Sequence, residues 1–214
     1  MKNMTYRFKT PKYPRNILYV NLIANYACTN NCRFCSREDA INKKKNIYEK
    51  KAKTSLYLPK SPSVDEIVDA IGRDIREDDQ ELAIIGLGEP LIYFSKVAEV
   101  IKRVKEKYNI KTRIDTNGVT NKSAEQLQGL DEIRISLNAV NEQEYNELCR
   151  PKVENAFLNL VNFVKSCANS TIDTYVSFVV GFKGTRTKEE YAQYAESLGV
   201  KKKNIIFRNY VKLN

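Results

Sequence analysis

The stretch NILYVNLIANYACTNNCRFC, residues 16–35, joins an apolar run directly to three cysteines. Residues 16–24 are mostly apolar and favour β structure, so we expect a strand there. Cys28, Cys32 and Cys35 then lie in the loop after this strand, in a CxxxCxxC spacing. Thiolates bind soft metals, and this spacing wraps three ligands around three corners of an iron–sulfur cube. The fourth corner has no protein ligand, and in a catalytic metal site an open position is where a substrate or cofactor binds.

Strand patterns alternate with helix patterns along the rest of the chain. Further strands are expected at residues 81–86, 112–115, 132–139, 171–180 and 204–211. Capping boxes predict helices that begin at Ser63 and Thr187, because each is followed three residues later by a Glu. Apolar spacing predicts other helices around residues 97–108, near Ala124 and at 157–164. Each helix must return the chain over the sheet, so the strands are parallel and the predicted fold is α/β, a partial, open (β/α)6 barrel of the TIM type.

The length of 214 residues and the apolar content of 42% predict a single domain over residues 1–214. We expect an N-terminal segment at 1–15 and a lysine-rich surface loop at 37–60, where no periodicity is clear. No apolar run is long enough to cross a bilayer, and the basic N-terminus lacks the apolar stretch of a secretory signal. The prediction is a cytoplasmic protein without membrane contact, whose cysteines stay reduced.

The chain is basic and contains no histidine. Its 36 Lys and Arg against 26 Asp and Glu give a net charge of +10, which favours acidic partners such as nucleic acid or an acidic protein. Much of the excess comes from one run of lysines, and such a run is usually just a solvated loop: Lys43, Lys44, Lys45, Lys50, Lys51 and Lys53. The absence of histidine excludes Ser-His-Asp catalysis and histidine-ligated metals. A structural zinc ion is the alternative for the cysteine cluster, and it would need Cys149 or Cys167 as its fourth ligand.

A second motif, GLGEP at residues 86–90, follows the second strand of the barrel. It is not a dinucleotide fingerprint, because Leu91 stands where the third glycine belongs and Pro90 lacks an amide donor. CxxxCxxC after the first strand, with Phe34 just before the last cysteine, and GLGEP after the second strand together resemble the radical S-adenosylmethionine (SAM) superfamily. The resemblance implies a partial barrel that contains the radical SAM core only.

The resemblance also implies the cofactors and their ligands. Cys28, Cys32 and Cys35 would hold a [4Fe–4S] cluster whose fourth iron binds SAM. Backbone groups of Gly86, Gly88, Glu89 and Pro90 would hold the amino group of the SAM methionine, and Phe34 and Val180 would flank the adenine. Reductive cleavage of SAM gives a 5′-deoxyadenosyl radical that abstracts hydrogen from an unidentified substrate, here expected to be a protein or RNA. The electron would come from a one-electron reductant such as flavodoxin or ferredoxin.

Two polar segments follow the third and fourth strands. IDTNG, residues 114–118, resembles the DTNG segment of many radical SAM enzymes, so Asp115 is predicted at the site, while Asn117 has a tight turn as its alternative role. Ser136 and Asn138 are two residues apart, which places them on one face of a strand. They resemble the positions that contact SAM, and ordinary filling of the barrel interior is the alternative.

Within the superfamily, the chain most resembles the small TatD-associated radical SAM proteins. This resemblance rests on the run from LYVNL through the cysteine loop, GLGEP, DTNG and SLNAVNEQEYNELCRP. Cys149, in ELCRP, is a candidate hydrogen donor to a substrate radical, and its alternative is a small buried hydrophobe. Cys167 is predicted to be structural. Two other functions stay open: a radical SAM enzyme that acts on a small metabolite, and a metal-binding module without catalysis.

Overall fold

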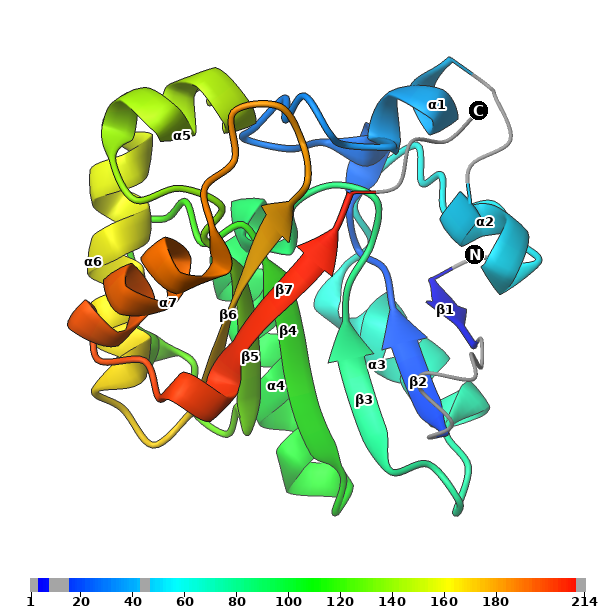
Figure 1. Cartoon of the computed structure of the whole chain (residues 1–214). Helices are drawn as coiled ribbons and strands as arrows, with labels where there is room; N and C mark the ends of the chain where they lie inside the picture. The colour runs from blue at the N-terminus through cyan, green and yellow to red at the C-terminus, as the bar shows by residue number, and fades with distance from the viewer. Residues whose placement is uncertain (1–3, 8–15, 43–46, 211–214) are drawn as a thin grey trace. The chain divides into compact units, whose positions relative to one another are not determined.

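The structure, a computed structural model, describes residues 4–7, 16–42 and 47–210. The chain forms two compact units. The first takes Met1–Cys28, Ser36–Asp115 and Gln126–Asp131, and the second takes Thr29–Cys35, Thr116–Glu125 and Glu132–Asn214. The strands follow one another in sequence order from β1 to β7, and among the described residues β1 and β7 are the edges of an open sheet (Figure 1). The single domain over 1–214 stays a prediction.

The strands of the first unit are β1 (Thr5–Tyr6), β2 (Ile17–Val20), β3 (Glu81–Ile84) and β4 (Lys111–Thr116). β1 pairs antiparallel with β2, whereas β2, β3 and β4 pair in parallel. The register places Val20 beside Ile84, and Ile84 beside Ile114. The carboxyl ends of these three strands therefore lie level, and the segments that follow them gather at one edge of the sheet.

The helices of the first unit are α1 (Arg37–Ile41), α2 (Ile47–Ala52), α3 (Val64–Asp74) and α4 (Phe94–Lys107). The predicted capping box at the start of α3 is confirmed, since Ser63 Oγ accepts from the Glu66 amide at 3.1 Å and Glu66 Oε2 accepts from the Ser63 amide at 2.8 Å. α4 buries the predicted apolar stripe, which includes Val97, Val100, Ile101 and Val104. Short 3₁₀ turns lie at η1 (Ala24–Tyr26) and η2 (Pro90–Tyr93).

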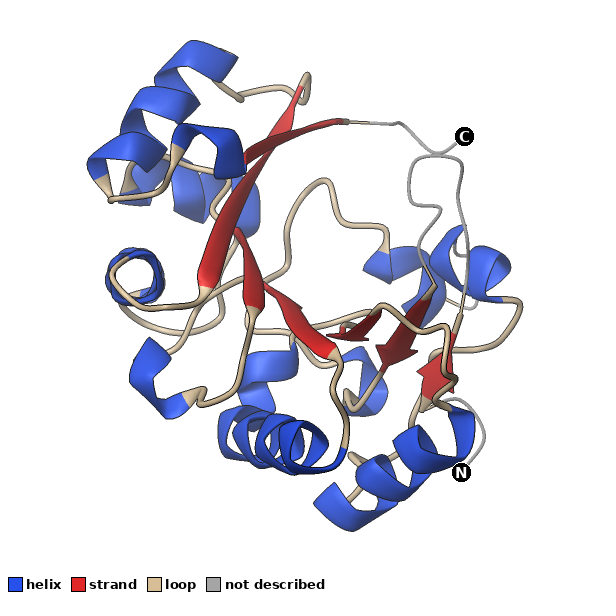
Figure 2. Ribbon diagram, turned by 90° about the horizontal axis from the view of Figure 1, so that it is seen from below, coloured by secondary structure: helices blue, strands red, loops and turns tan. Residues whose placement is uncertain are grey.

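The second unit contains the parallel strands β5 (Glu132–Ser136), β6 (Asp173–Val180) and β7 (Ile205–Asn209). Its helices are α5 (Glu142–Cys149), α6 (Ala156–Ala168) and α7 (Lys188–Ser197), and α6 and α7 contact β6 (Figure 2). The capping box at Thr187 and Glu190 is confirmed at the start of α7. The 3₁₀ turns η3 (Ala124–Gln126) and η4 (Lys202–Asn204) complete the unit.

Four local predictions were wrong or incomplete. The helix expected near Ala124 is only the single turn η3. Residues 37–60 are not one loop, because α1 and α2 form within them, and of the lysine run Lys50, Lys51 and Lys53 are exposed while Lys43–Lys45 lie outside the described residues. The strand β1 has two residues, too few to show a period. α5 is half buried, but one of its four buried side chains is the charged Glu144, so no helix was predicted there.

No helix in the described ranges combines the length and the apolar character that crossing a membrane requires.

Candidate active site

The glycine turn after β3 requires glycine at two positions. A Cβ atom on Gly86 would overlap Oδ1 of the buried Asn21, which follows β2. Gly88 has φ of +141°, which L side chains rarely adopt, and a Cβ atom there would overlap the carbonyl oxygen of Ala27. The sequence GLGEP thus lets this turn lie against the backbone that immediately precedes Cys28.

Hydrogen bonds fix the same turn from within the first unit. The amide of Glu89 donates to the Ala27 carbonyl at 2.9 Å, and Glu89 Oε1, which is buried, accepts from the Leu91 amide at 2.8 Å. Pro90 has no amide hydrogen. The amides of Glu89 and Leu91 are therefore engaged inside the protein and do not serve a ligand of this turn.

The side chains of Arg37 and Glu49, which the sequence did not identify, hold Tyr26 in the segment before Cys28. Asn25 and Tyr26 both have left-handed φ angles, of 51° and 52°. Arg37 Nη1, from α1, donates to the Tyr26 carbonyl at 3.0 Å, and the Tyr26 hydroxyl donates to Glu49 Oε1, in α2, at 2.9 Å. Burial and the bond to Glu49 raise the pKa of Tyr26 to about 12, so its phenol stays protonated. The short helices in the lysine-rich region therefore brace the entry to the cysteine segment.

The rest of the cysteine segment, Thr29–Cys35, belongs to the second unit. Cys35 donates its amide to the Cys32 carbonyl at 3.1 Å, so these two residues lie in one turn. The segment runs along the end of α5, where the Asn31 amide donates to the Cys149 carbonyl at 3.0 Å and the Arg33 amide to the Leu148 carbonyl at 2.9 Å. The backbone of the segment is therefore set by protein contacts.

The three predicted cluster ligands differ in exposure. Cys28 and Cys32 are partly buried, and Cys35 is exposed. Across the described ranges, no three Cys, Asp or Glu side chains converge as they would around a single metal ion. By chemistry alone, three thiols on one short segment are a donor set that suits iron, because thiolates bind soft metals. The roles of the three residues stay predictions.

Asn117 forms the turn that its alternative role required, and it also contacts the cysteine segment. Its Oδ1 accepts from the Val119 amide at 2.9 Å, and its Nδ2 donates to Thr29 Oγ1 at 2.8 Å. Gly118, at φ of +73°, has no room for a Cβ atom because Ile135 and Leu160 lie against it. The DTNG turn of this chain thus supports the residue that follows Cys28.

Asp115 lies on β4 in a buried charge cluster. Its Oδ1 is 2.8 Å from Arg113 Nε, and Arg113 Nη1 is 2.5 Å from Glu81 Oε1 on the neighbouring strand β3. Arg113 and Glu81 are buried, whereas Asp115 is half-buried. The side chain predicted to face SAM is therefore already held by an arginine.

Ser136 and Asn138 do not share a strand face. β5 ends at Ser136, and Asn138 has a left-handed φ of 58°, so the alternation of a strand does not extend to it. Asn138 Oδ1 accepts from the Val179 amide at 3.0 Å, which ties the end of β5 to β6. The amide side chain of Asn138 is thereby fixed in orientation, and its role towards SAM stays a prediction.

Phe34 has an aromatic neighbour that the sequence did not reveal. The rings of Phe34 and Phe182 pack edge to face with centroids 5.8 Å apart, and the Arg33 guanidinium lies over Phe182 at 5.3 Å. Val180 is buried two residues before Phe182, at the end of β6. The only feature of the sequence that could have pointed to Phe182 as a site residue is its position just after a predicted strand.

The two remaining cysteines are both fully buried. Burial raises the pKa of the Cys167 thiol to about 12, so this side chain is protonated in the absence of a metal, and its structural role stays a prediction. Cys149 ends α5 and its carbonyl holds the cysteine segment, while its role as a hydrogen donor stays a prediction.

Comparison with known proteins identifies the family. The model of the radical SAM superfamily matches residues 22–198 of this chain. No curated protein sequence matches it.

Solved structures share the fold at low sequence identity. TYW1 with a bound lysine-pyruvate adduct has a TM-score of 0.64 and 15% identity, over 94% of this chain and 67% of its own. SuiB of Streptococcus suis bound to the precursor peptide SuiA has a TM-score of 0.63 and 16% identity, over 92% of this chain and 40% of its own. AnSMEcpe with bound AdoMet has a TM-score of 0.60 and 15% identity, over 91% of this chain and 52% of its own. The chain thus spans about half the length of SuiB and anSMEcpe.

The predicted α/β fold with an open, mostly parallel sheet is confirmed. A family match over most of the chain excludes the metal-binding module without catalysis. The chain belongs to the radical SAM superfamily and is an enzyme whose cofactors are a [4Fe–4S] cluster and S-adenosylmethionine.

Proposed function

We propose that Cys28, Cys32 and Cys35 hold the [4Fe–4S] cluster, and that the glycine turn at residues 86–90 receives the methionine end of SAM. The observation that carries this proposal is the hydrogen bond from the Glu89 amide to the Ala27 carbonyl. It fixes the glycine turn one residue before the first predicted ligand. Two motifs far apart in the sequence are thereby brought together by backbone contact.

When bound, the cluster and SAM supply a 5′-deoxyadenosyl radical that abstracts hydrogen from the substrate. The chain's own residues bind and orient. The three thiolates act as ligands, and carbonyl oxygens of the glycine turn accept from the SAM ammonium group. Phe34 and Val180 provide apolar surface for the adenine, and Asp115, Ser136 and Asn138 provide polar groups near the ends of their strands.

We propose that the substrate is a macromolecule, a protein or RNA, and that the chain is one of the TatD-associated radical SAM proteins. The net charge of +10 supports an acidic partner. SuiB has been crystallised with its precursor peptide and anSMEcpe with AdoMet and the peptide Cp18Cys, so this fold accommodates peptides in other proteins. We further propose that the enzyme is cytoplasmic, because iron ligation needs reduced thiols. Its electron donor would be a one-electron reductant such as flavodoxin or ferredoxin.

Anaerobic reconstitution with iron and sulfide tests the cofactor assignment. The wild-type protein is expected to take up four irons per chain, as a [4Fe–4S] cluster has, and to release 5′-deoxyadenosine after reduction with SAM. Replacing any of Cys28, Cys32 or Cys35 with alanine should abolish both results, whereas Cys167→Ala serves as the matched control. Full iron content and turnover in a Cys35→Ala variant would falsify the ligand assignment.

Substrate class is tested with the same reconstituted enzyme. Protein, RNA and small-molecule fractions of a cell extract are each added, and the rate of 5′-deoxyadenosine formation is measured. We expect stimulation by the protein or the RNA fraction that protease or nuclease abolishes. Stimulation by the small-molecule fraction alone would replace the macromolecular proposal with a metabolite substrate.

A further inference from the structure

Helix α5 contacts the cysteine segment at its C-terminal end. The carbonyls of Leu148 and Cys149 accept from the Arg33 and Asn31 amides. One turn earlier, the buried Tyr145 hydroxyl accepts from Asn30 Nδ2 at 2.8 Å. The conformation of the segment that carries Cys32 and Cys35 therefore depends on the position of α5.

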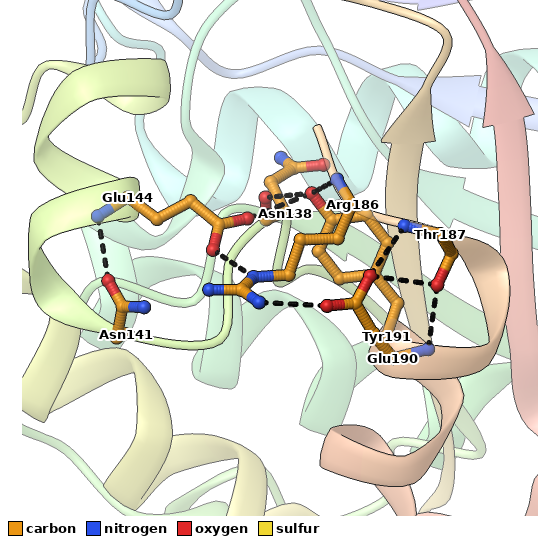
Figure 3. Close-up of polar contacts among 7 residues, drawn as sticks. All are labelled: Asn138, Asn141, Glu144, Arg186, Thr187, Glu190 and Tyr191. Carbon is orange, nitrogen blue, oxygen red and sulfur yellow. Dashed lines mark hydrogen bonds and ion pairs between the residues drawn. The ribbon is translucent and has the colours of Figure 1, made fainter. Parts of the chain in front are cut away.

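The N-terminal turn of α5 carries a buried carboxylate with two partners. Glu144 Oε1 accepts from the Tyr191 hydroxyl at 3.0 Å, and Glu144 Oε2 accepts from Arg186 Nε at 2.7 Å (Figure 3). Only 9% of Glu144 is exposed, and these two contacts offset the free-energy cost of burying its charged carboxylate. α5 is thus attached to α7 through Tyr191 and to the loop before α7 through Arg186.

Tyr191 is fully buried and joins three segments at its hydroxyl. Besides the bond to Glu144, the hydroxyl accepts from the Arg186 amide at 3.2 Å and lies 3.4 Å from the Asn138 carbonyl oxygen. Burial raises the pKa of Tyr191, so the phenol remains a donor to the carboxylate. Asn138, at the end of β5, is included in the same network (Figure 3).

The loop at residues 181–187 connects β6 to α7, and Arg186 lies near its C-terminal end. Its Nη1 is 3.0 Å from Glu190 Oε1, the carboxylate of the Thr187 capping box, so this end of the loop is tied to both α5 and α7. The other end begins with Gly181, at φ of +80°, and Gly184 also has a positive φ, of 91°. Between these glycines lies Phe182, which packs on Phe34 and under Arg33.

We propose that Glu144 is a positioning residue which, through Arg186 and Tyr191, holds the loop at residues 181–187 where Phe182 packs against Phe34. This inference rests on the proposed function, because Phe34 directly precedes the cluster ligand Cys35. All of these contacts lie within the second unit. The C-terminal end of α5 contacts the cysteine segment, and its N-terminal end contacts the loop at residues 181–187. Loosening the loop then weakens SAM binding without removing a cluster ligand.

Hydrogen–deuterium exchange of the reconstituted protein without SAM gives a readout independent of turnover. In Glu144→Ala, exchange in residues 182–187 is expected to rise more than about tenfold, because tenfold is the factor for losing one charge-assisted hydrogen bond and this variant loses two. Glu147→Ala removes an exposed carboxylate from the same helix and should leave this exchange unchanged. Arg186→Gln breaks the contact from a side chain that is 37% exposed, so it should raise loop exchange without a risk to the core.

Kinetics and iron content separate positioning from a general loss of structure. Glu144→Ala and Arg186→Gln should keep wild-type iron content and raise the KM for SAM about tenfold. They should change kcat by less than about twofold, and Arg186→Lys should restore only part of the effect because an ammonium lacks the guanidinium fork. Unchanged loop exchange in both variants, or a lower kcat with an unchanged KM, overturns the proposal. A wild-type protein that binds no cluster would instead defeat the proposed function, while the exchange comparison would still decide the role of Glu144.

Discussion

Asn117 donates from its Nδ2 to Thr29 Oγ1 at 2.8 Å, one residue after the first cysteine of the segment. The same side chain accepts from the Val119 amide, so it uses both ends of its amide on the protein. Asn117 therefore both stabilises its own turn and supports the cysteine segment.

The first prediction separates these two contacts. Thr29→Val removes the acceptor for Asn117 Nδ2 and keeps the bond from the Val119 amide, whereas Asn117→Ala loses both. Each hydrogen bond contributes about 1 kcal/mol, so the free energy of unfolding should fall about twice as far in the alanine variant. Iron content after reconstitution should fall in both variants. Equal iron uptake by the wild type and both variants would show that the bond to Thr29 does not position the cysteine segment.

The second prediction concerns Gly88. Alanine there places a Cβ atom against the Ala27 carbonyl and forces a side chain into φ of +141°. The backbone before Cys28 must shift, and a displacement of this kind should lower 5′-deoxyadenosine formation by about a hundredfold. Gly199→Ala is the control, because Gly199 also has a positive φ, of 89°, but follows α7. The control should lose stability and keep its activity per folded molecule.

The third prediction concerns Arg113, which lies between the carboxylates of Glu81 and Asp115. Arg113→Ala leaves two carboxylates without their cation in a buried place, and this should lower the free energy of unfolding by about 3–5 kcal/mol. Arg103 is the matched control, since it also contacts two carboxylates, those of Asp65 and Glu99, but is 41% exposed. Its replacement should lower the free energy of unfolding much less, because solvent screens these exposed ion pairs. Urea unfolding of both variants makes the comparison, and equal losses would contradict it.

The fourth prediction is a pH dependence carried by Asp131. Burial raises the pKa of this carboxyl group, but hydrogen bonds from Thr112 and Lys105 outweigh burial and hold the pKa below its ordinary value of 3.8. The folded state therefore binds the proton less tightly than the unfolded state. The stability that Asp131 contributes is present above the ordinary pKa and is lost as the pH falls through the lower folded value.

Asp131→Asn removes this titration. Unfolding measured at about pH 6 and about pH 3 should show a smaller acid-induced loss of stability in the variant than in the wild type. An identical loss in the two proteins would mean that Asp131 does not carry the effect. Glu147→Gln, at an exposed carboxylate, changes the net charge by the same amount and serves as the control for the altered net charge.

The strands and the longer helices could be predicted from the sequence because their signals are local. The apolar stripe of α4 and the capping boxes at Ser63 and Thr187 are each contained within a few turns of chain. The motif CxxxCxxC and the glycine pair in GLGEP are equally local. These patterns predicted the fold, which is confirmed, and the residues of the proposed site, which stay predictions.

The contacts that support the site could not be read in this way. The carbonyl of Ala27 meets the amide of Glu89, and Glu144 meets Arg186, across long stretches of sequence without any side-chain pattern. α5 was missed because its first turn is acidic and one of its four buried side chains is the charged Glu144, which breaks the apolar pattern. The prediction that Ser136 and Asn138 share one strand face was wrong because it assumes extended backbone, whereas Asn138 has a left-handed φ.

The amides of Asn31 and Arg33 pair with the end of α5. These two residues lose conformational entropy through contacts within the polypeptide itself. A substitution that unwinds the last turn of α5 would therefore raise the entropic cost of ordering the proposed ligands Cys32 and Cys35 without changing either side chain.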